Sequence, residues 1–251
     1  MLLAIDIGNT NTVLGIFDGE KLERAWRIKT DARSTADELA LTFRGLLTDH
    51  EIDSVAACST VPAALRELRA MLDEYYSNVP TVIVEPGIRT GVSLQYENPK
   101  EVGSDRIVNT LAAHHLVGAR PVIVVDFGTT TNFDVVSAEG DFLGGSFAPG
   151  LEVSAESLFG RASRLFRVPL TPPATAIGKN TADCLRSGIV FGYVGLVEGL
   201  LARIVAELPA KPTVIATGGL AATIAPLATG IEKVDEDLTL EGLRLLYELN
   251  A

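Results

Sequence analysis

The 251-residue sequence predicts an α/β fold with mixed sheets that is built twice in one chain. The main observation is an internal repeat, because the residue types at 4–10 recur at 124–130, an offset of 120 residues. Each copy is a short apolar strand that ends in Asp-x-Gly, followed by a polar turn and a second strand. Patterns of helix and strand then alternate in each half. We therefore expect two domains, at residues 1–118 and 119–251.

The first half contains clear signals for the ends of its elements. Thr35 is a suitable N-cap, and Glu38 three residues later places an acid in the first turn of a helix. Pro62 suits the first turn of a second helix. The elements expected after the first hairpin are strands at 23–29, 54–58 and 81–84, and helices from 35 to about 47 and at 62–75.

The second half repeats this order loosely. A helix that begins near residues 103–106 leads into it. The elements expected beyond that helix are hairpins between 122 and 147, a helix after Gly150, a Pro-rich loop at 169–173, a long helix from about 181 to 208, a strand at 213–216 and closing helical segments.

Composition excludes several classes of protein. Apolar residues make up 47% of the chain and charged residues 21%, which suits a compact globular protein. The net charge of -11 argues against a broad surface for nucleic acid or anionic membrane, because such partners need clustered Lys and Arg. An anionic substrate would therefore need local basic residues.

Two cysteines and the N-terminal residues favour a reducing compartment. Cys58 and Cys184 each lie in an apolar run, so we expect both to be packing residues rather than a disulfide pair. The first residues lack the basic segment and long apolar stretch of a signal peptide. No apolar run approaches 18 uninterrupted residues, so we expect no membrane span and a cytoplasmic protein.

The first Asp-x-Gly turn has the residues that a polyphosphate site requires. Gly8 allows close approach of the backbone, Asn9, Thr10 and Thr12 supply donors, and the Asp6 carboxylate can hold Mg²⁺. A single turn of this kind usually only closes a hairpin. Two such turns with a shared acid, one in each half, favour nucleotide phosphates in a cleft between the halves.

A third turn completes this pattern. Residues 216–220 contain Gly218 and Gly219 after an apolar strand, which suits either an adenosine-binding loop or simply a tight turn into a helix. Other ATP-binding signatures are absent: Gly178 and Lys179 lack the spacing of a P-loop, and we find no dinucleotide or protein-kinase motif. The order of the three turns matches the actin and sugar-kinase scheme.

Asp105 and Arg106 begin a helix between the halves. In a first helical turn the helix dipole favours an ionised carboxylate, so Asp105 can accept a hydroxyl proton. Arg106 can neutralise an anionic substrate or the phosphoryl oxygens. The alternative is an ordinary helix cap with a structural ion pair.

The ordered motifs resemble those of the type III pantothenate kinase family over essentially the whole chain. They are Asp-x-Gly-Asn-Thr at 6–10, Tyr-x-Asn-Pro at 96–99, Gly-x-Asp-Arg at 103–106, Asp-x-Gly-Thr at 126–129, Gly-Gly-x-x-x-Pro-Gly at 144–150 and Gly-x-Asn-Thr at 178–181. The resemblance implies an actin-like kinase that transfers phosphate from ATP to the primary hydroxyl of pantothenate, the first committed step toward coenzyme A.

The resemblance also implies roles for single residues in a cytoplasmic homodimer whose site lies at the subunit interface. Asp105 would be the proton acceptor, Asp126 would bind a monovalent cation, K⁺ or NH₄⁺, and Thr181 would reach the substrate from the partner subunit. ATP would contact Asp6, Ile7, Gly8, Asn9, Thr10, Asn11, Thr12, Val13 and Thr129, and pantothenate would contact Tyr96, Gly103, Ser104, Asp105, Arg106 and Thr181.

One motif departs from the family pattern. The family commonly has Gly-Thr-Ala-Thr-Thr after the second acid, whereas here Thr129 is followed by Thr130, Thr131 and Asn132. We expect this change to alter the second phosphate turn more than the reaction class. The rival functions are a non-catalytic nucleotide-binding regulator and a kinase for another small hydroxylated substrate.

Overall fold

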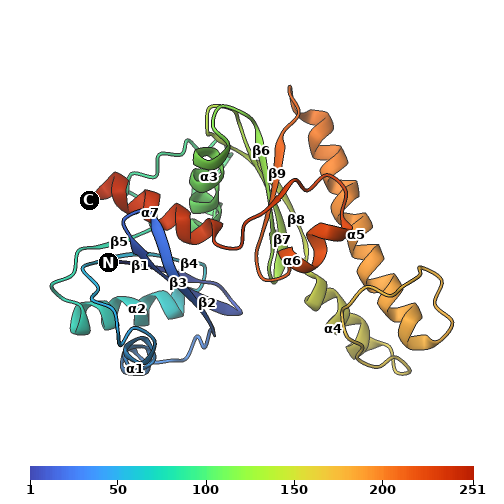
Figure 1. The fold of residues 1–251 in the computed structure, drawn as a ribbon, viewed down its shortest axis with the longest axis horizontal. Helices are drawn as coiled ribbons and strands as arrows, with labels where there is room; N and C mark the ends of the chain where they lie inside the picture. The colour runs from blue at the N-terminus through green and yellow to red at the C-terminus, as the bar shows by residue number, and fades with distance from the viewer. The chain divides into compact units, whose positions relative to one another are not determined.

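The structure, a computed structural model, describes residues 1–251, and its contacts divide the chain into two compact units. Unit 1 comprises residues 1–115 and 237–251, and unit 2 comprises residues 116–236. Figure 1 colours the chain from blue at the N-terminus to red at the C-terminus and labels the main helices and strands.

Unit 1 is built on a five-stranded sheet with the order β3-β2-β1-β4-β5. β1 pairs antiparallel with β2 and parallel with β4. The predicted Thr35 cap is present as a capping box with Glu38. The elements are β1 (Leu2–Ile7), β2 (Asn11–Asp18), β3 (Lys21–Lys29), α1 (Ala36–Leu46), β4 (Ser54–Ser59), α2 (Pro62–Tyr75), β5 (Thr81–Ile83), the 3-10 helix η1 (Pro99–Glu101), α3 (Ser104–Val117) and α7 (Leu238–Asn250).

Unit 2 is built on a second five-stranded sheet with the order β10-β9-β6-β7-β8. β6 pairs antiparallel with β7 and parallel with β9. The elements are β6 (Val122–Phe127), β7 (Thr130–Val136), β8 (Phe142–Pro149), α4 (Leu151–Arg161), α5 (Thr181–Glu207), β9 (Thr213–Thr217), α6 (Ala221–Ile224), the 3-10 helix η2 (Ala225–Leu227) and β10 (Lys233–Val234).

The two sheets confirm the predicted duplication. β1 and β6 have the same place in their sheets, each between an antiparallel hairpin partner and a parallel strand. The acids of the repeat have equivalent positions, since Asp6 lies opposite Val13 and Asp126 opposite Asn132. The fold is therefore the duplicated actin-like α/β fold that the sequence predicts.

The closing helix differs from the predicted domain boundary. α7 follows unit 2 in sequence, but it packs against β1 and β4 of unit 1. Its buried Leu240, Leu243 and Leu246 share a core with Leu2 and Ala4 of β1. Because β1 is buried on both faces, its even-numbered side chains need this cover, and a helix from the far end of the chain supplies it.

α5 is long and apolar enough to be compared with a membrane-spanning helix. It is 27 residues long and passes a test for a membrane span by length and composition alone, although it contains Glu198. A core helix passes the same test, and Tyr193, Val194, Val197 and Leu201 of α5 pack into the core of unit 2. The sequence predicts this helix, but an uninterrupted-run criterion does not mark it as a candidate span, because Glu198 and four glycines divide the apolar run.

Candidate active site

Asp6 lies at the carboxyl end of β1, where strand alternation turns its side chain to the same face as Leu2 and Ala4. The parallel pairing of β1 with β4 places Cys58 directly beside it. The Cys58 Sγ donates a hydrogen bond to Asp6 Oδ1 at 3.4 Å. Two neighbouring strand ends therefore hold this carboxylate in place.

The turn after Asp6 is exposed at its tip and is held at its base by a hydrogen bond between side chains. The Gly8 N–H donates to the Asn11 carbonyl at 3.0 Å, and Asn9 and Thr10 are exposed. The Thr12 hydroxyl is buried and lies 2.9 Å from the Thr30 hydroxyl. In this structure Thr12 therefore holds the turn against the end of β3, whereas the sequence reading treated it as a phosphate donor.

Asp105 lies in the first turn of α3, close to the ends of β1 and β4. The Ser104 hydroxyl donates to the Ser59 carbonyl at 3.1 Å, which ties the start of α3 to the end of β4. A Cβ at Gly103 would lie 2.5 Å from Asp105 Oδ1, so a larger residue there would displace this carboxyl group. Asp105 Oδ1 is buried and has no hydrogen-bond partner.

Burial raises the pKa values of both acids. Burial, together with the nearby Asp105 carboxyl, raises the pKa of Asp6 from 3.8 to about 7. Burial also raises the pKa of Asp105, although the Arg106 backbone N–H and the Arg106 charge oppose the change. Burial likewise raises the pKa of the Cys58 thiol, so this side chain is a neutral donor. A cation or a transferable proton would relieve the repulsion between the carboxylates.

These residues fit Mg²⁺ as it is usually bound with nucleotides. The structure contains no group of three or more His, Cys, Asp or Glu side chains that would enclose a metal ion. Mg²⁺ in phosphotransferases is instead held by one or two carboxylates and the substrate phosphates. Asp6, with the unpaired Oδ1 of Asp105 nearby, has the chemistry for that arrangement.

The predicted substrate residues of unit 1 lie at the start of α3 and in the irregular segment before η1. Ser104, Asp105 and Arg106 are consecutive at the start of α3, and the Arg106 side chain is buried. Tyr96 lies half-buried in the irregular segment between β5 and η1. Asn98 caps η1 by accepting from the Lys100 N–H at 3.3 Å, so its role is to hold the segment that precedes Gly103.

In unit 2, Asp126 lies against the loop that follows β9. Gly218 adopts a φ of +90°, and a Cβ there would lie 2.4 Å from Asp126 Oδ1. The Gly128 N–H closes the second turn by donating to the carbonyl of Thr130, two residues later, at 3.0 Å. In the first turn the Gly8 N–H donates to the carbonyl of Asn11, three residues later. The second turn is thus one residue shorter. Gly150 packs against it, with its N–H donating to the Thr129 carbonyl at 3.0 Å.

We expect Gly218→Ala to destabilise unit 2 strongly. The new Cβ would meet Asp126 Oδ1 and the Phe127 carbonyl, and the positive φ would add strain, so the loss should be roughly 3 kcal/mol. Urea unfolding followed by circular dichroism would measure it. Gly45→Ala, at an exposed α1 position with open space, is the control and should not destabilise the protein. Equal stabilities of the two variants would contradict the close packing.

Sequence reasoning missed one side chain behind the second turn. The Tyr193 hydroxyl of α5 lies 2.5 Å from the Thr131 hydroxyl, and both are buried. The sequence predicts only a long helix for the α5 segment. The pairing was not visible there because 62 residues separate the two positions and Tyr193 lies in an otherwise apolar helix.

Thr181 is the first residue of α5 and is exposed. Asn180 caps this helix, with its side chain accepting from the Asp183 N–H at 2.9 Å. Cys184, predicted to be a packing residue, is in fact exposed, and its Sγ donates to the Gly178 carbonyl at 3.4 Å. A cysteine in an apolar sequence run is not buried when it falls on the open side of a first helical turn.

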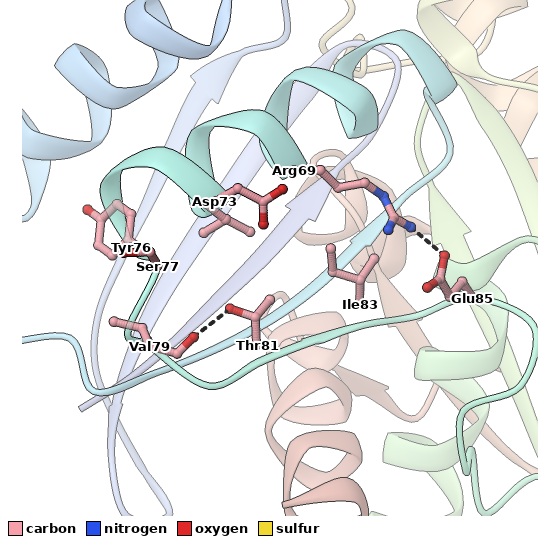
Figure 2. A pocket seen from close by; sticks show the side chains of 9 residues that line it. Arg69, Asp73, Tyr76, Ser77, Val79, Thr81, Ile83 and Glu85 are labelled. Atoms are coloured by element: carbon pink, nitrogen blue, oxygen red, sulfur yellow. Dashed lines mark hydrogen bonds and ion pairs between the residues drawn. The ribbon is translucent and has the colours of Figure 1, made fainter.

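A separate surface pocket lies between α2 and β5, with a volume of about 310 Å³. Figure 2 shows the Arg69–Glu85 ion pair at one end of the pocket and the Thr81 hydroxyl bonded to the Val79 carbonyl at the other. None of the predicted site residues lines this pocket. It is therefore distinct from the carboxylate site at the ends of β1 and β4.

Solved structures of low sequence identity share the fold. A Streptomyces griseus ROK family glucokinase, solved with glucose and AMPPNP, matches with a TM-score of 0.55 and 14% identity, covering 98% of each chain. A Campylobacter jejuni protein described as a Baf family transcriptional activator matches with a TM-score of 0.63 and 19% identity, covering 98% of this chain and 97% of that one.

Comparison of sequences identifies relatives of much higher identity than these structures. The family model for type III pantothenate kinase matches residues 2–203. Proteins named type III pantothenate kinase are 57% identical in Frankia alni, over 250 residues, and 58% identical in Salinispora arenicola, over 253 residues, with full coverage of both chains in each case. With the paired Asp-x-Gly turns and the acid at the start of α3, these matches show that the chain belongs to the type III pantothenate kinase family.

Proposed function

We propose that this chain transfers the terminal phosphoryl group of ATP to the primary hydroxyl of pantothenate, the first committed step toward coenzyme A. The observation that carries the proposal is the buried Asp105, whose Oδ1 has no partner and which lies near Asp6 at the ends of two parallel strands. A group that accepts a proton from a substrate hydroxyl needs such an open acceptor.

In this mechanism Asp105 orients the pantothenate hydroxyl and takes up its proton as the new O–P bond forms. Its raised pKa suits that task, because a general base works best when its pKa approaches the working pH. Arg106 offsets negative charge beside it. Phosphoryl transfer needs chiefly alignment and charge stabilisation, which are the contributions of these fixed side chains.

The phosphates of ATP are proposed to bind the two Asp-x-Gly turns through backbone N–H groups and the exposed Asn9, Thr10 and Thr129. Mg²⁺ held near Asp6 would neutralise charge on the phosphate oxygens. Asp126 is proposed to hold K⁺ or NH₄⁺, because its carboxylate lies at a strand end where the backbone of the Gly218 loop approaches closely.

A cytoplasmic homodimer is the proposed form of the enzyme. Unit 2 exposes large apolar side chains on β8, on α4 and in the segment between α4 and α5: Leu143, Phe147, Val153, Leu158, Phe166 and Ile177. Ile177 is 80% exposed, and large exposed apolar side chains in one unit support a protein contact there. A second copy of the chain is the proposed occupant, and it would bring Thr181 to the substrate.

The test is ADP release from ATP and Mg²⁺, with and without pantothenate, with K⁺ or Na⁺ as the only monovalent cation. We expect release that requires pantothenate and is faster with K⁺. ATP binding without turnover would contradict the proposal and favour a nucleotide-binding regulator. Turnover only with another hydroxylated acid or sugar would overturn the choice of substrate but not the kinase chemistry.

A further inference from the structure

The segment that leads into Thr181 has no regular secondary structure but is tied down at several points. It covers residues 162–180 between the end of α4 and the start of α5. Unstructured connections of this length are uncommon in compact domains unless they serve a function. We call residues 162–180 the α4–α5 loop.

Arg186, in the second turn of α5, makes most of these ties. Its Nε donates to the Thr171 carbonyl at 3.1 Å, and its Nη2 donates to the Thr171 hydroxyl at 2.8 Å and to the Pro172 carbonyl at 3.2 Å. Its Nη1 donates to Asp183 Oδ1 at 3.4 Å. The Arg186 side chain is 27% exposed, and its bonds to Thr171 and Pro172 lie at the surface, so several bonds made at once hold the loop.

Asp183 carries this network to the start of the helix. The other oxygen of its carboxylate accepts from the Asn180 side-chain amide at 2.7 Å, while its N–H donates to Asn180 Oδ1 at 2.9 Å. Asn180 is the N-cap, and Thr181 is the next residue. A continuous set of hydrogen bonds therefore runs from the Pro-rich part of the α4–α5 loop to the residue before Thr181.

Two further contacts hold the loop against the same two turns. The Ser187 hydroxyl donates to the Ala176 carbonyl at 2.6 Å. A Cβ at Gly178 would lie 2.4 Å from the Cys184 N, so the loop backbone packs directly on the helix. The Arg186 guanidinium holds the earlier part of the loop, at Thr171 and Pro172, against the same helix turns that contact Ala176 and Gly178.

We propose that Arg186 is a positioning residue for pantothenate: it fixes the α4–α5 loop and the Asn180 cap so that Thr181 has a single orientation toward substrate. This inference rests on the proposed function, because it assigns Thr181 to pantothenate. A planar five-donor guanidinium is needed, since a lysine ammonium cannot reach the two carbonyls, the hydroxyl and the carboxylate at once.

The first test compares Arg186→Met with wild type in the full-length enzyme. We expect KM for pantothenate to rise about tenfold, with KM for ATP unchanged, because only the segment next to Thr181 is released. Arg203→Met is the matched control, an exposed arginine on the same helix, and should leave both constants unchanged. Equal increases in both KM values, or no change in either, would overturn the positioning role.

The second test measures the loop without any substrate. Trypsin sites at Arg164, Arg167 and Lys179 lie in the α4–α5 loop, and mass spectrometry can follow cleavage at each. Arg186→Met should speed cleavage at these sites about tenfold, because local opening no longer breaks the Arg186 bonds. Unchanged cleavage would overturn the proposal even if pantothenate is the substrate. Faster cleavage with no turnover of pantothenate by the wild-type enzyme would instead refute the proposed function.

Thr171→Val serves as a milder variant in case Arg186→Met folds poorly. It removes only the hydroxyl that accepts from Nη2 and keeps both backbone carbonyls as acceptors. We expect changes in the same direction but smaller, about twofold to threefold in KM for pantothenate and in cleavage rate. Wild-type values in both measurements would contradict the network.

Discussion

Asp105→Asn should lower kcat about 10³-fold while ATP still binds with nearly its wild-type Kd. The amide has almost the same shape and keeps the packing beside Gly103, but it cannot accept the hydroxyl proton. Steady-state ADP release measures kcat, and calorimetric titration measures the Kd for ATP. A loss confined to kcat would assign Asp105 to the chemical step.

Two further variants make this result specific to the position of the carboxylate. Asp73→Asn, on the exposed side of α2, should leave kcat unchanged. Asp105→Glu keeps the acid but moves it by one methylene, so it should recover only a small part of the rate. A near wild-type kcat for Asp105→Asn would show that another group takes the proton.

Asp6→Asn should make the protein more stable at pH 8, although it weakens activity. The folded pKa of Asp6 is about 7, above its ordinary value of 3.8, so the native state binds a proton more tightly than the unfolded state does. This contribution to stability is full below about pH 4 and is lost as the pH rises through 7. The asparagine variant has no charge to bury and escapes that loss.

The shift from 3.8 to about 7 sets an upper limit of about 4 kcal/mol on this effect. Because Asp6 keeps some solvent exposure, we expect a gain of about 2 kcal/mol at pH 8 and almost none at pH 4. Urea unfolding midpoints at both pH values provide the measurement. Asp18→Asn, at the exposed end of β2, is the control and should show no such dependence on pH. A variant that gains equally at both pH values would contradict the charge explanation.

Both predictions concern a site whose residues can be identified from the sequence but whose interactions cannot. Asp6 and Asp105 were visible in sequence because each lies in a motif of consecutive residues. Their mutual repulsion was not, since it arises only when α3 is tied to the end of β4 through Ser104 and Ser59. Cys58 is buried in the core, as the sequence predicts, but its bond to Asp6 is not readable there because it depends on a parallel register between positions 52 residues apart.

By itself the sequence determined the duplicated α/β fold, most element boundaries and the two Asp-x-Gly turns. These features depend on local physics: the alternation of apolar residues in strands, the capping box of Thr35 with Glu38, Pro62 at the start of α2 and glycine in tight turns. Such preferences involve residues only a few positions apart, so they can be read along the chain.

Only the tertiary structure decided which distant segments meet. It placed α7 on the sheet of unit 1, set Tyr193 behind Thr131 and gave Arg186 its place over the α4–α5 loop. The two-residue strand β10 also escaped prediction, because it is too short to show a pattern and exists only through its pairing with β9. Contacts of this kind depend on burial and hydrogen bonds across long sequence separations, and no pattern of neighbouring residues encodes them.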